Sequence, residues 1–562
     1  MPVLQQSLLD TERLRLDVIA KFWEIPLTSH RRREMALQLA EAMPSPEAVA
    51  AARAKLTNDQ REALRTVAAG GGTLPQRVFA RQWGDIRVMG PGRMDREHPW
   101  ENPVSPAEAL WYSGFLFKTF AEGSDGAYEA VAIPAEILDL LPAPAEDTAA
   151  LSLDPASPPP IVNSAGAELL EDACTFLSYV HNHQPAYSSE GTWSARHNKQ
   201  LLPRLLHQTR DRFHFLRHLA SRIGWVTDQN ARRASLVPDA VTEWLTSQPN
   251  EQRRLMYVSW RDDPTWNDLF HVPTLQPEDT GAWRNDPLLA REAILAHLAA
   301  CTPTSWLEIE RFVGEIKRVD PDFQRPTGDY ETWYIKDDVT GAYLSGFESW
   351  DAVEGRLIRY LLTGPLFWLG LIDLGTEKPG QSPRAFRLSD AGAAILGLRD
   401  QPVPTEPPTI RLRSGFQLLV PIGRRYERFQ VGRVAEWLDS GERYRYRLTP
   451  ASLQRAKEQR ITIPRVLTFL EDHLQGPVPR HMREALSQWD ERGTEASLHQ
   501  AVLLRTTNEA IMERALASGR VAHLVEERIS PTAVVVRRGD WPEMIEALEQ
   551  LGLLADAQDA AE

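Results

Sequence analysis

The stretch at residues 349–398 reads SWDAVEGRLIRYLLTGPLFWLGLIDLGTEKPGQSPRAFRLSDAGAAILGL. Apolar residues recur in its first part at the spacing of a helix, at Val353, Leu357, Tyr360 and Leu361. This spacing predicts an amphipathic helix that ends at residues 364–365, because a proline has no N–H to donate. Short apolar runs at residues 371–374 and 385–388 flank a segment rich in glycine and proline, which predicts two strands around a turn. Ser389 is then expected to cap a further helix.

This stretch therefore has the order helix, strand, turn, strand and capped helix, which resembles the order of elements in a winged-helix domain. The last part of this order, from the first strand to the start of the final helix, recurs at residues 115–134, 225–239 and 443–450. The returns follow no fixed period, which argues against a solenoid. The sequence therefore predicts an α+β fold, mainly α, in which tandem winged-helix domains precede a small C-terminal α/β layer domain.

Proline-rich segments indicate where the domains end. One such segment, at residues 146–165, is a predicted linker, and a second, at residues 402–408, precedes the last domain. Residues 84–104, within the first winged-helix domain, are expected to form an irregular loop. The predicted domains are a helical module at residues 1–50, winged helices at 51–145, 166–280 and 281–400, and a final domain at 409–562.

Composition and length restrict the class of protein. The chain has 562 residues, of which 42% are hydrophobic and 25% charged, and this length corresponds to roughly three to five domains. No apolar run is long enough to cross a membrane, and the first residues lack the pattern of a signal peptide, so we expect a cytoplasmic protein. Cys174 and Cys301 are isolated, which argues against a disulfide framework or a zinc site, and His181 and His183 lack an acidic cluster beside them.

The formal net charge is −14, yet the basic residues gather in two blocks. Phosphate binding depends on a local basic surface rather than on the net charge, so both blocks are candidate nucleic-acid contacts. In the block at residues 196–236, a basic helix precedes a basic turn, and the predicted contacts are Arg196, Lys199, Arg204, Arg210, Arg217, Arg232 and Arg233. In the block at residues 411–470 they are Arg424, Arg425, Arg428 and Arg445. The alternative for either block is a solvated surface without a ligand.

The first 50 residues contain two short predicted helices, and residues 30–33 (His-Arg-Arg-Arg) open the second one. Backbone N–H groups at the start of a helix and positive side chains both attract phosphate. This arrangement resembles a SAP-type module, which implies DNA backbone contacts by Arg31 and Arg32. A helical hairpin that only packs on the next domain is the alternative.

The C-terminal sequence has a distinctive order of elements. The run YRYRLTPASLQRAKEQRITIPRVLTFLEDHLQGPVPRHMREALSQWDERG, at residues 444–493, predicts a strand, a threonine-capped helix and two helices bracketed by prolines. Strand, helix, strand and helix follow. Residues 411–555 resemble the helicase-associated domain on the N-terminal side of XPB-type helicases. The resemblance implies a region that engages DNA as an accessory to an ATP-driven motor.

The motor itself has no counterpart in the sequence. A helicase motor needs a phosphate-binding loop of the form G-x-x-x-x-G-K-[ST], and the glycine-rich residues 70–73 lack the lysine. We therefore expect no enzymatic activity and no cofactor. The predicted function is non-catalytic binding of duplex or forked DNA beside a separate helicase, in repair or transcription. The alternatives are a protein-interaction scaffold of winged-helix modules and, more remotely, a nuclease with a site built from scattered acidic residues.

Overall fold

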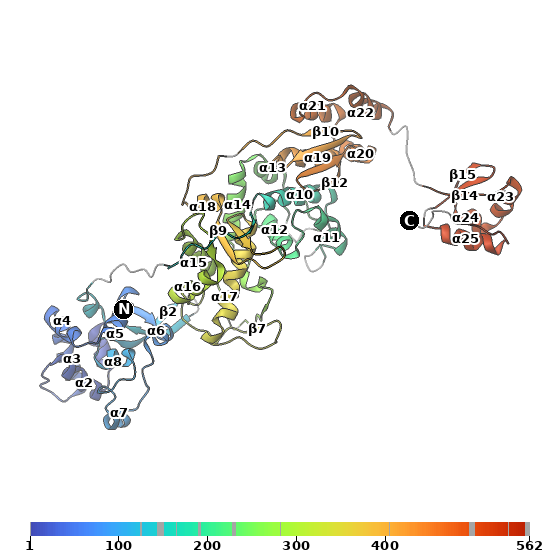
Figure 1. Ribbon diagram of the computed structural model, residues 1–562. Coiled ribbons are helices and arrows are strands. Elements are labelled where there is room, and N and C mark those ends of the chain that lie inside the picture. Colours follow the sequence, from blue (N-terminus) through green and yellow to red (C-terminus); the bar gives the residue numbers. More distant parts are fainter. Residues whose placement is uncertain are drawn as a thin grey trace. The chain divides into compact units, whose positions relative to one another are not determined.

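The computed structural model describes residues 2–556 apart from 124–125, 143–150, 165, 189–192, 228–231, 282, 404, 494–500 and 538 (Figure 1). The fold is mixed α and β. Contacts divide it into two compact units, Met1–Leu448 with His473–Gln475 and Thr449–Asp472 with Gly476–Glu562. The predicted turn at residues 228–230 lies outside the described residues, as do residues 146–150 and 165 of the predicted linker. No helix among the described residues is both long and apolar enough to cross a membrane.

The N-terminal region of the first unit is a small α/β assembly with its own hydrophobic core. Its helices are α1 (Leu4–Leu9), α2 (Arg13–Trp23), α3 (Arg32–Ala42), α4 (Pro46–Ala54), α5 (Asn58–Ala69), α6 (Gln76–Trp83), α7 (Pro91–Glu97), α8 (Pro106–Tyr112) and α9 (Ala135–Leu138). Strands β1 (Thr73–Pro75), β2 (Phe117–Gly123) and β3 (Gly126–Ala132) form an antiparallel sheet in the order β1-β3-β2. Thr57 begins α5 with a capping box, and Ser105 caps α8, whose first residue is a proline.

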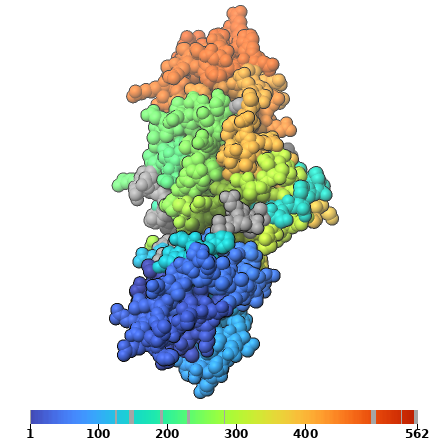
Figure 2. Space-filling view, turned by 90° about the vertical axis from the view of Figure 1, so that its left-hand side faces the viewer, coloured from blue at the N-terminus to red at the C-terminus, as the bar shows by residue number. Residues whose placement is uncertain are grey.

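The central region follows with a second core that extends from Leu169 to Phe429. Its helices are α10 (Glu168–His183), α11 (Ala195–Leu201), α12 (Arg210–Arg222), α13 (Pro238–Thr246), α14 (Pro249–Arg261), α15 (Pro287–Ala299), α16 (Ile309–Val319), α17 (Trp350–Leu361) and α18 (Asp390–Ile395). Its strands are β4 (Ile161–Asn163), β5 (Leu275–Pro277), β6 (Leu307–Glu308), β7 (Ile335–Asp337), β8 (Ile372–Thr376) and β9 (Ala385–Leu388). The green and yellow surfaces of this region adjoin in Figure 2, as expected of segments that share one core.

The stretch at residues 349–398 has the elements that its sequence predicts. Helix α17 runs to Leu361, and the chain kinks at Gly364, whose backbone angles are not helical, just before Pro365. Strands β8 and β9 pair in antiparallel fashion, and the Ser389 side chain accepts a hydrogen bond from the Gly392 N–H. A Cβ at Gly392 would lie 1.9 Å from the Leu371 carbonyl oxygen, so only glycine allows α18 to approach β8 this closely.

The last part of the first unit is a four-stranded antiparallel sheet with one helix. Strands β10 (Arg411–Arg413), β11 (Gln417–Pro421), β12 (Glu436–Asp439) and β13 (Arg443–Arg447) have the order β10-β11-β13-β12. Helix α19 (Arg425–Val434) packs on α10, and its Phe429 belongs to the central core. Trp437 lies in β12, the element directly after α19.

The second unit contains helices α20 (Pro450–Glu458), α21 (Ile463–His473), α22 (Arg480–Arg492), α23 (Glu509–Leu516), α24 (Gly519–Leu524) and α25 (Trp541–Gln550). Strands β14 (Val502–Arg505), β15 (Val525–Ser530) and β16 (Ala533–Val536) form a sheet in the order β14-β16-β15. Thr449 starts α20 with a capping box, as its position after a strand and before Pro450 predicts. A small core joins α23, α24 and α25 to this sheet.

Four features differ from the expectations. Helix α7 lies inside residues 84–104, which were predicted to be irregular. Residues 161–163, assigned to the linker, form β4 and pair with β8. The two strands predicted near residues 225–237 are reduced to an isolated bridge between Val226 and Leu236. The division between the two compact units falls after Leu448, inside the domain predicted at residues 409–562.

Candidate nucleic-acid interface

Strand β13 alternates arginine with tyrosine. Tyr444 and Tyr446 are buried, with exposed fractions of 0% and 5%, and they lie on the inner side of the sheet with Leu418 and Val420 of β11. Because neighbouring residues in a strand point to opposite sides, the arginines of β13 lie on the outer side. The alternation thus separates an apolar face from a basic one.

Strand β10 extends the basic face at the other side of β11. Arg411 pairs with Leu419, which pairs with Arg445, so these three side chains lie in one row across the sheet. In the next row Arg413 pairs with Gln417, which pairs with Arg447. Residues directly opposite each other in an antiparallel pair share a face. The outer side therefore carries five arginines, which we name the arginine face: Arg411, Arg413, Arg443, Arg445 and Arg447.

The arginine face is open to solvent and only partly neutralised. It surrounds a shallow hollow of about 420 Å³ that is lined by four of these arginines together with Leu419 and Glu442. Arg445 forms an ion pair with Asp439, and the Arg411 Nε donates to the Gln475 side chain at 2.9 Å. Among the described residues, no carboxylate lies within 4.0 Å of the guanidinium groups of Arg413, Arg443 or Arg447.

Two predicted contacts on α19 are inside the protein instead. Arg425 and Arg428 have exposed fractions of 3% and 1%. The Arg425 Nη1 lies 2.7 Å from Glu171 Oε1, and the Arg428 Nη2 lies 3.1 Å from Glu171 Oε2. Glu171 belongs to α10, so the two arginines connect α19 to α10. The prediction that they contact phosphate is wrong, because their guanidinium groups are enclosed and paired.

Arg424 precedes them and is also occupied. Its side chain is 18% exposed and forms ion pairs with Glu406 and Glu427, both at 3.0 Å. It donates further hydrogen bonds to the carbonyl oxygens of Pro407 and Pro408. This side chain joins the segment before β10 to the start of α19, and its phosphate contact stays a prediction.

The block at residues 196–236 keeps most of its basic side chains on the surface. Arg196, Lys199, Arg210, Arg232 and Arg233 are exposed, and none of them has a carboxylate within 4.0 Å among the described residues. The pKa of His197 is lowered, first by burial and then by the positive charges of Arg196 and Arg233. Arg196 on α11 and Arg233 after α12 therefore both lie near His197.

The remaining predicted residues vary in exposure. Arg217 on α12 is half-buried, and burial lowers its pKa. Arg204 lies over the rings of Tyr179 and Trp437, at 5.3 Å and 5.0 Å. Arg31 and Arg32 are exposed at the start of α3, where Arg31 pairs with Glu34 at 3.3 Å. The last two lie in the N-terminal region.

The site prediction therefore missed four members of the arginine face. It included Arg425 and Arg428 of α19 and Arg424, which precedes that helix. The signal was present in the sequence, because alternation of arginine with apolar residues at residues 411–413 and 443–447 is the period of a strand with one exposed side. No cluster of three or more possible metal ligands occurs in the part of the chain that the structure describes.

Residues 416–530 match the family described as the helicase conserved C-terminal domain. No curated protein matches the chain. The matched segment begins just before β11 and includes three of the arginines of the arginine face. It links this part of the chain to helicase-related proteins and to functions that involve nucleic acid.

Proposed function

We propose that this chain is a non-catalytic, helicase-associated protein that binds the backbone of duplex or forked DNA, and that the arginine face is a main contact. The observation that carries the proposal is the set of five arginines on one side of the sheet, three of which have no carboxylate partner among the described residues. The match of residues 416–530 to a helicase domain family supports the part of the proposal that concerns helicases and nucleic acid.

The chemistry of the face suits phosphate. Duplex DNA carries one negative charge for about every 1.7 Å of its axis, and a protein that neutralises phosphates releases condensed counterions. Each guanidinium is planar, keeps its charge and donates two parallel hydrogen bonds to a phosphate. Arginines two residues apart in a strand are separated by roughly 6.8 Å, and neighbouring strands by roughly 4.8 Å, which gives a dense basic patch.

Backbone contacts do not read sequence. Base recognition requires side chains that enter a groove and pair with base edges. The arginine face lies on a sheet whose outer side is broad, with a shallow hollow at its centre. We therefore expect similar affinity for duplexes of different sequence.

The winged-helix architecture is part of the proposal. Two segments follow the order helix, strand, helix, helix, strand, strand: α5 to β3, with α7 inserted, and α15 to β9, with β7 inserted. In each segment the first strand pairs with the last, and the last pairs with the strand before it. This shared connectivity supports two winged helices.

The absence of a motor sequence motif supports a role beside a separate helicase. Hydrolysis of ATP measured with and without forked DNA tests this statement. We expect no turnover above background, and DNA-stimulated hydrolysis by the purified chain would contradict the non-catalytic assignment.

The DNA proposal is tested by fluorescence anisotropy with labelled forked and duplex DNA over a range of salt. The variant Arg413→Ala/Arg443→Ala/Arg447→Ala removes the three arginines without carboxylate partners. We expect a loss of affinity of about tenfold or more, and a decrease in the salt slope of about 0.9 for each phosphate contact that is lost.

The matched control is Arg311→Ala/Arg384→Ala/Arg399→Ala. It removes the same charge from exposed arginines that already pair with Asp154, Glu308 and Asp390. We expect this control to bind like the unmodified chain. Equal binding by both triple variants, or no binding by the unmodified chain at about 50 mM salt, would refute the proposal.

A further inference from the structure

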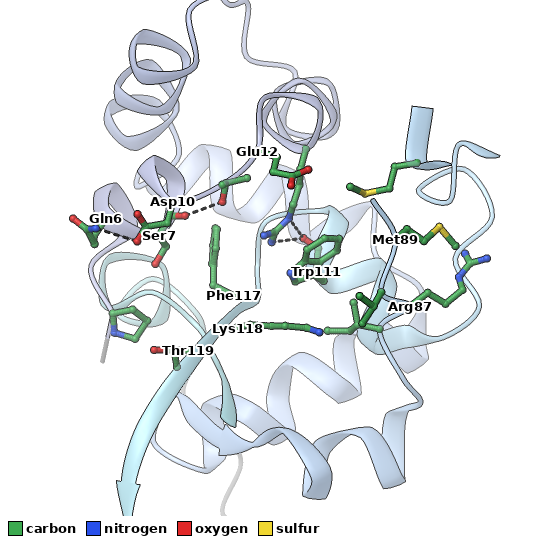
Figure 3. A pocket seen from close by; sticks show the side chains of 16 residues that line it. Gln6, Ser7, Asp10, Glu12, Arg87, Met89, Trp111, Phe117, Lys118 and Thr119 are labelled. Carbon is green, nitrogen blue, oxygen red and sulfur yellow. Dashed lines mark hydrogen bonds between the residues drawn. The ribbon is translucent and has the colours of Figure 1, made fainter. Parts of the chain in front are cut away.

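A second site lies in the N-terminal region, where a pocket of about 400 Å³ opens between the connection of α1 to α2, the segment before α7, and the start of β2. Figure 3 shows Gln6, Ser7 and Asp10 on one side of Phe117, and Met89 with Arg87 on the other. Trp111 lies between these two groups. A cavity of this size with a few polar groups and apolar walls is typical of a small-molecule site.

Arg15 of α2 lines this pocket although only 6% of the residue is exposed. Its Nε and Nη2 donate to the Trp111 carbonyl oxygen at 3.1 Å and 2.7 Å, and Nη2 also donates to the Leu116 carbonyl oxygen at 2.9 Å. Its Nη1 has no hydrogen-bond partner among the described residues. The guanidinium lies over the Trp111 ring at 3.9 Å and the Phe117 ring at 4.9 Å, which fixes its position.

The charge of Arg15 is uncompensated. No carboxylate lies within 4.0 Å of it in the described part of the chain. Burial lowers the pKa of Arg15 to about 9, which is the response of a guanidinium removed from water without an anion beside it. Buried charges in proteins are normally paired. No Arg15 atom is among the enclosed polar atoms that lack a partner, so Nη1 opens to the pocket, where a bound anion would pair with this charge.

The other walls define the rest of the ligand. Lys118 of β2 is exposed, lines the same pocket and has no carboxylate partner among the described residues. Met89, Met94 and Trp111 supply apolar surface, and methionine adapts to varied shapes. Asp10 and Glu12 line the side formed by the α1–α2 connection, so a ligand with negative charge at both ends would be repelled there.

We propose that this pocket binds a small amphipathic organic anion, with its one anionic group at Arg15 and Lys118 and its apolar body against Met89, Met94 and Trp111. A medium-chain carboxylate and a nucleoside monophosphate, whose aromatic base would be the apolar part, both meet this description. Arg87 does not serve the anion, because its guanidinium pairs with the buried Glu108.

The test is isothermal titration of the full chain with octanoate, adenosine monophosphate and inorganic phosphate. We expect octanoate or the nucleotide to bind with a dissociation constant between about 1 μM and 1 mM. The organic probe that binds shows whether the anionic group of the ligand is a carboxylate or a phosphate. Binding of inorganic phosphate as tightly as either organic probe would overturn the proposal, because the apolar walls would then contribute nothing.

Variants assign the binding to this pocket. Lys118→Glu places a like charge beside the anion and is expected to weaken binding by about tenfold or more. Lys21→Glu makes the same change on an exposed residue of α2 outside the pocket and is expected to leave affinity unchanged. Arg15→Lys keeps the charge but removes the planar donor set, and we expect weaker binding by a chain whose folded state is checked by thermal unfolding.

The triple variant of the arginine face separates this site from the DNA contact. Arg413→Ala/Arg443→Ala/Arg447→Ala is expected to bind the organic anion normally while it loses DNA affinity. Absence of binding by both organic probes, or affinity that is unchanged in Lys118→Glu, would refute the pocket proposal and leave the DNA proposal untouched.

Discussion

Arg428 on α19 and Arg447 on β13 lie in the same basic block of the sequence, yet their environments are opposite. Arg428 is 1% exposed, donates to the Thr175 hydroxyl at 2.7 Å and lies 3.8 Å from the centre of the Tyr444 ring. Arg447 is exposed on the outer side of the sheet and has no carboxylate partner among the described residues. One basic block of the sequence therefore contains both buried, paired arginines and exposed arginines. The presence of the block does not show which arginines belong to which group.

The two groups also differ in what their charges do. Glu171, itself fully buried, faces both Arg425 and Arg428. Removal of one partner from such a group leaves a charge in a medium that solvates it poorly. The arginine face keeps its charges in water, where each is available to an external anion and contributes little to folding.

The largest expected effect is on folding. Glu171→Ala leaves Arg425 and Arg428 buried without their carboxylate, and we expect the free energy of unfolding to fall by about 3–5 kcal/mol. Urea denaturation measured by tryptophan fluorescence provides the value. Glu310→Ala is the matched control: it removes an exposed carboxylate paired with Arg359, and a change of less than about 1 kcal/mol is expected. Similar losses for both variants would mean that burial of the pair makes no difference.

Most elements were predictable because the local signals are strong. The helix at residues 350–361 follows from apolar spacing, and Ser389 and Thr449 cap their helices as small polar residues before a helix do. The two strands at residues 372–376 and 385–388 were marked by apolar runs around a turn. These features depend on neighbours in the sequence, so the sequence contains the information directly.

The errors have a common physical origin in contacts between distant residues. The burial of Arg425 and Arg428 depends on Glu171, more than 250 residues away in the chain, and no local pattern reveals that partner. Strand β4 forms because residues 161–163 pair with β8, which lies about 200 residues later in the chain. The local sequence of residues 161–163 does not reveal this partner and is therefore interpreted as a linker. The arginine face is different, because its alternation of arginine with apolar residues is local and can be recognised in the sequence.

The neighbouring acid on α10 provides an intermediate case. Asp172 is buried and pairs with a single arginine, Arg212, at 3.2 Å, whereas Glu171 has two. Burial raises the pKa of Asp172 to about 6, and Arg212 with the N–H groups of Leu206 and His207 opposes this only in part. At Asp172, one arginine therefore does not fully offset the burial of the carboxylate.

This raised pKa predicts a pH dependence. The folded chain holds the proton of Asp172 more tightly than the unfolded chain, whose value is 3.8. Its contribution to stability is therefore complete below pH 3.8 and is lost as the pH rises to about 6. We expect the unmodified chain to lose roughly 2–3 kcal/mol relative to Asp172→Asn across this window. Urea denaturation of both proteins at a series of pH values gives the difference.

The difference in the free energy of unfolding between the two proteins excludes the effects of other groups that titrate beside Asp172. Glu168 and His207 form an ion pair next to it and are present in both proteins. A constant difference between the two proteins from pH 4 to pH 7 would contradict the raised pKa. A difference of the opposite sign would mean that Arg212 more than offsets the burial of this carboxylate.

The smallest expected effect is on the surface and concerns the ion pair between Asp439 and Arg445 of the arginine face. Asp439 accepts hydrogen bonds from Arg445, and both side chains are well exposed, at 39% and 46%. An exposed pair of this kind stabilises folding by at most about 1 kcal/mol, so Asp439→Ala is expected to leave the unfolding transition almost unchanged.

The same change frees Arg445 for phosphate, and we expect DNA affinity to rise by a few-fold with a salt slope steeper by up to about 0.9. Anisotropy titrations against Asp390→Ala, which frees the exposed Arg399 away from this face, distinguish the two positions. Tighter binding by Asp439→Ala alone would place phosphate on the arginine face. Equal gains in affinity for both variants would mean that the change in the net charge of the protein explains the effect.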